Sequence, residues 1–129
     1  MTWYDVSPLL HPGVKILPKS TDKGIELEFV GEISMENPSK IFFPYVEKVH
    51  REALEHGASE VCLNLTKLSY LNSSGILMFM KWVKLIQGAP PDLHYMLHIV
   101  YSKAIAWQRV GMRTLRKMAP SVVDLTEME

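Results

Sequence analysis

The sequence has one cysteine, Cys62, and no excess of charge of either sign. A single thiol excludes an internal disulfide, and its place among apolar residues indicates a space-filling side chain in a reducing compartment. Lysine plus arginine and aspartate plus glutamate both number 14, so the chain lacks the broad positive field on which non-specific nucleic-acid binding depends. We therefore expect no nucleic-acid partner.

Long hydrophobic runs are also missing. The longest, around Ile76 to Met80, is far shorter than the roughly 20 residues that a membrane-spanning helix needs. The start of the chain, Met1 to Asp5, has neither the positive charge nor the apolar stretch of a secretion signal. These absences predict a cytoplasmic protein that does not use a membrane as a partner.

The sequence contains none of the common catalytic or cofactor motifs. It has no Walker phosphate loop, no dinucleotide fingerprint and no Gly-x-Ser-x-Gly nucleophile elbow. His94 and His98 would share one strand face about 13 Å apart, at roughly 3.3 Å per residue, which is too far to bind one ion. We expect no metal, no cofactor and no enzymatic activity.

The chain length and apolar content suit one compact unit. At 129 residues with 47% hydrophobic content and no shift in composition, the sequence predicts a single domain over residues 1–129 with a core at about 14–125.

Strand and helix signals alternate along this domain. Residues 24–33 indicate a strand, because Ile25, Leu27 and Phe29 alternate with Glu26 and Glu28. This strand can pair as a hairpin with 14–17 across a turn at 21–24. A helix is expected from Asn37-Pro38-Ser39 to Gly57. The other expected elements are a strand over 61–65 covered on both faces, a helix over 74–87, a strand over 93–100, a helix over 103–118 that is broken or tightened near Gly111, and a strand over 121–125. This order predicts an α/β fold with a mixed sheet whose later strands are parallel.

The most informative motif is Asn72-Ser73-Ser74-Gly75, between an apolar strand and an apolar helix. Asparagine and serine are preferred N-cap residues, so one interpretation is simple helix capping. The other is a functional loop, because a hydroxyl at the positive end of a helix is a place where an added phosphate is tolerated. The residues alone leave both interpretations open.

The motif and the order of elements around it resemble the STAS domains, named for sulfate transporters and anti-sigma factor antagonists. The signature of that family is a hydrophobic strand, a short loop, an acidic residue followed by Ser-Ser/Thr-Gly, and an apolar helix; the resemblance covers roughly residues 24–125, with Asn72 at the acidic position. It implies a STAS-like single domain with a mixed, mainly parallel sheet, an N-terminal hairpin and packed helices. It also implies a non-catalytic bacterial signalling module, in which a partner serine kinase of the anti-sigma type phosphorylates Ser73 and a matching phosphatase reverses the modification.

We expect the partner protein, which is such a kinase or another signalling enzyme, to contact this motif and the helix that follows. The helix has more apolar positions than a one-sided helix needs, so at least one of Met78, Phe79 and Trp82 is expected to be exposed for contact. The same apolar edge could serve a homodimer. The expected partner-binding residues are Asn72, Ser74, Gly75, Met78, Phe79 and Trp82.

Two further possibilities remain open at the level of sequence. The domain could be an unphosphorylated STAS-like scaffold or a sensor of a small anion or nucleotide held by Asn72, Ser73 and the helix N-terminus. Separately, the helix over 103–118 carries a basic stripe that is either a solvated face or a site for an acidic partner or anionic ligand. The stripe consists of Arg109, Arg113, Arg116 and Lys117.

Overall fold

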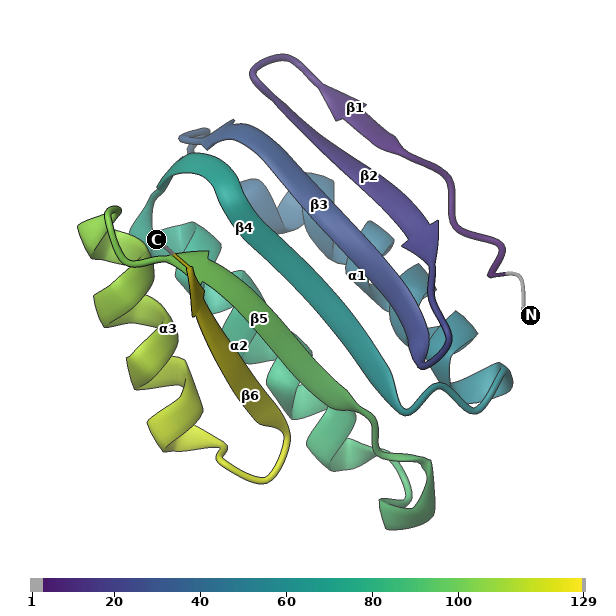
Figure 1. The fold of residues 1–129 in the computed structure, drawn as a ribbon. Coiled ribbons are helices and arrows are strands. Elements are labelled where there is room, and N and C mark those ends of the chain that lie inside the picture. The colour runs from purple at the N-terminus through teal and green to yellow at the C-terminus, as the bar shows by residue number, and fades with distance from the viewer. Residues whose placement is uncertain (1–3, 129) are drawn as a thin grey trace.

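The computed structural model describes residues 4–128, which form one six-stranded sheet and three α-helices (Figure 1). The strands are β1 (Leu9–His11), β2 (Val14–Ser20), β3 (Gly24–Ile33), β4 (Glu60–Leu71), β5 (Met96–Ser102) and β6 (Val123–Met128). The helices are α1 (Pro38–Glu55), α2 (Ser73–Gly88) and α3 (Ala106–Met118), with a short 3₁₀ turn, η1, at Pro91–Leu93. No helix among the described residues is long and apolar enough to cross a bilayer.

The strands lie side by side in chain order, from β1 at one edge to β6 at the other. The first three pair antiparallel, whereas β3, β4, β5 and β6 are joined by parallel pairs. The predicted hairpin of β2 and β3 and the predicted mixed, mainly parallel sheet are therefore confirmed. The edge strand β1 was not predicted.

The core lies between the sheet and the helices, which are all on one face of the sheet in Figure 1. Side chains that point to the helices, such as Val61, Leu63 and Leu65 of β4, are fully buried. Their neighbours Cys62 and Asn64 point to the other face and are only half-buried. The prediction that this strand is covered on both faces is therefore wrong, because no helix within residues 4–128 covers the face on which Cys62 and Asn64 lie (Figure 1).

Strand β4 is much longer than the predicted strand over 61–65. Two β-bulges interrupt the alternation of its second half, which the sequence pattern therefore did not reveal. At the first bulge, β3 advances two residues, from Glu28 to Val30, while its partner β4 advances three, from Asn64 to Lys67. At the second bulge, β3 advances one residue while β4 advances two, from Leu68 to Tyr70. Beyond Asn64, β4 pairs with β3 but no longer with β5. The carbonyl groups on its β5 side therefore need other partners there.

Gln108 of α3 supplies those partners. Its side chain is fully buried, and its Nε2 donates to the carbonyl oxygens of Leu65 at 2.6 Å and Leu68 at 2.7 Å. Its Oε1 accepts from the backbone N–H of Ser102 at 2.8 Å. One glutamine thus joins α3 to the bulged end of β4 and to the end of β5. Helix α3 is continuous through Gly111, contrary to the expected break.

The centre of the core contains a short chain of buried polar groups. Trp82 Nε1 donates to the hydroxyl oxygen of Tyr95 at 2.8 Å, and that hydroxyl lies 2.8 Å from His50 Nδ1. Because the indole can only donate, the single proton of Tyr95 is free to go to His50, which must then accept at Nδ1 as a neutral imidazole. Burial lowers the pKa of His50 below its usual 6.5.

The low pKa of His50 predicts a loss of stability in mild acid. As pH falls below 6.5, the unfolded chain takes up a proton at this position that the folded chain does not, so the free energy of unfolding decreases. Urea unfolding of the parent chain and His50→Gln at pH 7.5 and 5.5 measures this. The parent should lose more stability between the two conditions than the variant. The same pH dependence in both chains would show that His50 remains free to protonate in the fold.

Candidate functional site

The predicted motif lies where β4 ends and α2 begins. Asn72 is the N-cap of α2, and its Oδ1 accepts from the backbone N–H of Gly75 at 2.8 Å. Its Nδ2 donates to the carbonyl of Met35 at 2.8 Å, in the loop between β3 and α1. Both ends of the amide are therefore used within the chain. An aspartate at this position could keep the cap but could not donate to Met35.

We expect this double role to appear in a pair of substitutions. Asn72→Ala loses the cap and the bond to Met35, which together should lower the free energy of unfolding by about 2 kcal/mol. Asn72→Asp keeps the cap and should fall between the parent and the alanine variant in urea unfolding at pH 7. If Asn72→Asp were as stable as the parent, the contact with Met35 would contribute nothing.

The two serines of the motif open α2 and differ in exposure. Ser73 is the first residue of the helix and is exposed, whereas Ser74 is half-buried. Within residues 4–128, neither hydroxyl makes a hydrogen bond. The Ser73 hydroxyl is thus both accessible and located at the end of α2 where backbone N–H groups favour negative charge.

Gly75, which the sequence analysis names as a partner-binding residue, has a packing role in the structure. It is buried, and a Cβ at this position would lie 2.2 Å from Leu71 Cδ1. Any larger residue would require the Leu71 side chain to shift. The structure therefore places Gly75 in the packing beneath the start of α2.

Met78, Phe79 and Trp82 are all fully buried, so the prediction that at least one of them is exposed is wrong. The reason is the position of α2, which packs on the sheet and also against α1 and so buries a wide arc. Phe79 meets Phe29 of β3 edge to face, with ring centroids 5.9 Å apart. Trp82 makes the hydrogen bond to Tyr95 described above.

The apolar residue that is exposed beside the motif is Leu77, with 53% of its surface accessible. It lies one helical turn after Ser73 and therefore on the same face of α2. Tyr70 at the end of β4 is 48% exposed and Val110 of α3 is 62% exposed. Helix α3 contacts both elements that flank the motif. Trp107 Nε1 donates to the carbonyl of Ser69 in β4 at 3.1 Å, and a Cβ on Gly111 would lie 3.6 Å from Ile76 in α2.

We call Ser73 and Leu77, which helical spacing places on one face of α2, the Ser73 surface. Sequence reasoning missed Leu77. A usable signal was present, because the buried set of α2 follows helical spacing and leaves Ser73, Leu77, Lys81 and Lys84 on the outer face. The buried set is Gly75, Met78, Phe79, Trp82, Val83 and Ile86.

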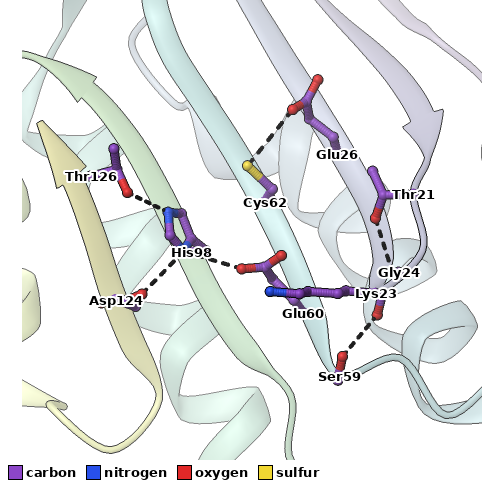
Figure 2. Close-up of polar contacts among 10 residues, drawn as sticks. All are labelled: Thr21, Lys23, Gly24, Glu26, Ser59, Glu60, Cys62, His98, Asp124 and Thr126. Carbon is purple, nitrogen blue, oxygen red and sulfur yellow. Dashed lines mark hydrogen bonds and ion pairs between the residues drawn. The ribbon is translucent and has the colours of Figure 1, made fainter. Parts of the chain in front are cut away.

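The open face of the sheet carries a second polar group, shown in Figure 2. His98 of β5 is central: its Nδ1 lies 3.1 Å from a carboxylate oxygen of Glu60 and 3.1 Å from one of Asp124, and its Nε2 lies 2.7 Å from Thr126 Oγ1. These contacts join β4, β5 and β6 across the sheet. They satisfy both nitrogens of the ring, which suits a structural role.

Cys62 lies beside His98 in the strand register, and its Sγ is 3.9 Å from a carboxylate oxygen of Glu26 (Figure 2). Burial, with the nearby charges of Glu26 and Glu60, raises the pKa of this thiol to about 11. A thiol that stays protonated at neutral pH is a poor nucleophile and a poor metal ligand. The inferred role as a buried, space-filling side chain is wrong, because Cys62 is only half-buried and lies on the open face of the sheet.

One group of side chains within residues 4–128 places potential metal ligands close together, and the sequence analysis did not identify it. Glu52, Glu55 and His56 each offer an atom within 4.8 Å of the others. Glu52 is already engaged, since it accepts from the Asp5 N–H at 2.6 Å and pairs with Lys48 at 3.6 Å and His56 at 3.4 Å. These contacts make it an ion-pair network at the end of α1.

Comparisons with known proteins show which fold this is. No protein-family model matches the sequence. No curated protein matches it either. Among solved structures, an anti-sigma factor antagonist from Mycobacterium paratuberculosis aligns over 89% of this chain and 88% of its own, with a TM-score of 0.58 and 14% identity.

A second similar structure is the complex of the diguanylate cyclase SiaD with its activator SiaC from Pseudomonas aeruginosa. The likeness is to SiaC; it covers 98% of this chain and 96% of the matched chain, with a TM-score of 0.62 and 18% identity. Both likenesses are of fold. They confirm the predicted α/β, STAS-like architecture over almost the whole chain.

Proposed function

We propose that this chain is a non-catalytic signalling module that docks on a partner protein through the Ser73 surface and is switched by phosphorylation of Ser73. The main support is the position of the Ser73 hydroxyl at the start of α2, one turn before the exposed Leu77. Ser73 is exposed, and its hydroxyl makes no hydrogen bond within the described residues. An apolar side chain beside an accessible hydroxyl suits a contact that a charge can disrupt.

The fold supports a regulatory role by analogy. One similar structure is an anti-sigma factor antagonist, and the other is an activator bound to a diguanylate cyclase. We infer that the partner is a signalling enzyme or an anti-sigma-type serine kinase, that a matching phosphatase removes the phosphate, and that these events occur in the bacterial cytoplasm.

The proposed switch is electrostatic. A phosphate adds about −1.5 to −2 charges at pH 7, and this charge would have to lose its water for the partner to remain bound beside Leu77. The N-terminus of α2 stabilises the added charge in the free chain. Phosphorylation therefore favours the unbound chain without unfolding it.

The alternative of an anion or nucleotide sensor loses its main residue in this structure. Asn72 was expected to help hold the ligand, but its Oδ1 and Nδ2 are both bonded within the chain.

The test is intact mass and phosphosite mapping of the chain isolated from its native cells during growth and under stress. We expect phosphate on Ser73, with an occupancy that changes between conditions. A strain carrying Ser73→Ala is the matched control and should show no phosphate in the peptide that contains the motif. An unmodified Ser73 in every condition, or a phosphate that remains after Ser73→Ala, would contradict the proposal.

A further inference from the structure

A groove of about 600 Å³ lies between α3 and β6, and no residue of α2 lines it. Its apolar part consists of Pro120, Leu125 and the side of Tyr101. The cations Arg113, Arg116 and Lys117 line it from α3, and Glu127 lines it from β6. This volume is within the usual range of ligand-binding sites.

The groove carries more positive than negative charge. Helix α3 contains four cationic side chains and no acidic residue, although the whole chain is neutral. Glu127 is occupied, since one of its carboxylate oxygens accepts from Arg113 at 3.0 Å and from the Tyr101 hydroxyl at 2.9 Å. Arg116 and Lys117 make no ion pair or hydrogen bond within residues 4–128. Arg116 and Lys117 lie in the last turn of α3, where positive charge interacts favourably with the helix dipole. That interaction does not account for the groove beside them.

The strand that borders the groove has a free edge. Strand β6 pairs with β5 on one side, and no described strand pairs with its other side. A free edge presents backbone N–H and C=O groups that are complementary to another extended backbone. In Figure 1, α3 runs alongside this edge, so a strand added to β6 would have α3 over one of its faces.

We infer that the α3–β6 groove binds an extended acidic peptide segment of a protein partner, which pairs with the free edge of β6 and directs carboxylates to Arg116 and Lys117. Successive side chains of a strand alternate in direction, so acidic residues at every second position would all face α3. Strand addition supplies affinity through backbone hydrogen bonds, and the groove supplies specificity through alternate side chains. A small free anion would satisfy the cations but would leave the strand edge unused. None of the residues that line this groove belongs to the Ser73 surface.

The probe is a fluorescein-labelled octapeptide of alternating glutamate and threonine, titrated with the full chain and followed by fluorescence anisotropy. The double variant Arg116→Glu/Lys117→Glu should weaken binding at least tenfold. The matched control, Lys81→Glu/Lys84→Glu on the outer face of α2, makes the same change in net charge and should alter binding less than twofold. Circular dichroism spectra that match the parent establish that both variants fold.

Two further peptides separate strand pairing from simple charge attraction. A peptide of the same composition with its glutamates in one block places carboxylates on both faces and should bind more weakly. A peptide that is N-methylated at every second residue cannot donate to the edge and should lose at least tenfold in affinity. Inorganic phosphate, added as a competitor, should not displace the peptide at matched ionic strength.

Several outcomes would overturn the inference. These are an equal loss in the two double variants, full binding of the N-methylated peptide, displacement by phosphate alone, and no binding of the alternating peptide up to about 1 mM. Light scattering tests whether the chain self-associates. Self-association without peptide binding would indicate that the free edge of β6 pairs with a second copy of the chain, and this would also overturn the inference.

Discussion

Ser73→Glu should weaken capture of the partner about 100-fold or more, while Ser73→Ala should leave capture intact. The glutamate places a charge beside Leu77 in the proposed contact, and an unpaired charge at an interface costs about 2–5 kcal/mol. The same substitution should change the free energy of unfolding by less than about 1 kcal/mol, because Ser73 is exposed and a carboxylate suits the first turn of a helix.

The measurement is quantitative affinity capture from the native cells, with urea unfolding of the same variants. Ser7→Glu, at an exposed serine before β1, adds the same charge elsewhere and should capture the partner as well as the parent does. Leu77→Ala should weaken capture without adding charge, since it removes the apolar contact. Equal capture by Ser73→Ala, Ser73→Glu and the parent would disprove the charge switch.

The second large effect is on stability. Gln108→Ala should lower the free energy of unfolding by at least about 3 kcal/mol, because it leaves two buried carbonyls and one buried N–H without partners. A loss of this size should lower the melting temperature of a domain this long by roughly 10 °C. The affected groups belong to Leu65, Leu68 and Ser102, so β4 and β5 both lose their hydrogen bonds to the Gln108 side chain of α3.

Two variants make this prediction specific. Gln108→Glu has nearly the same shape but replaces the donor nitrogen with an oxygen that faces two carbonyls, and it should be at least as damaging at pH 7. Gln87→Ala, at an exposed glutamine near the end of α2, should change stability by less than about 0.5 kcal/mol. If urea unfolding placed Gln108→Ala within 1 kcal/mol of the parent, the side chain would not be satisfying those backbone groups.

Much of the fold could be predicted because its local signals agree with its tertiary structure. The alternation in β3, the Asn-Pro start of α1 and the Gly-Ala-Pro-Pro sequence that ends α2 all indicate the correct elements. The full extent of β4 could not be predicted. At each of its two bulges, two consecutive side chains lie outside the core: Thr66 and Lys67 at the first, and Ser69 and Tyr70 at the second. These pairs interrupt the period of two by which a strand is recognised in a sequence.

The candidate site was predictable in position but not in detail. The motif correctly located the start of α2 and the exposed Ser73. Trp82 is buried where α2 packs on the sheet and α1, and its hydrogen bond is to Tyr95; the second bond of Asn72 is to Met35, which lies in a distant loop. Contacts between residues so far apart in sequence leave no periodic signal, so the sequence alone did not distinguish the buried Met78, Phe79 and Trp82 from the exposed Leu77.

The most direct test of the central claim compares the affinity of the captured partner for the unmodified chain and for the chain fully phosphorylated at Ser73. Isothermal titration calorimetry on the two purified forms measures this. A near-complete switch requires the phosphate to weaken binding by about 10⁴-fold, and this is the result we predict. Equal affinities for the two forms would contradict the account, because the Ser73 surface would then bind its partner regardless of charge.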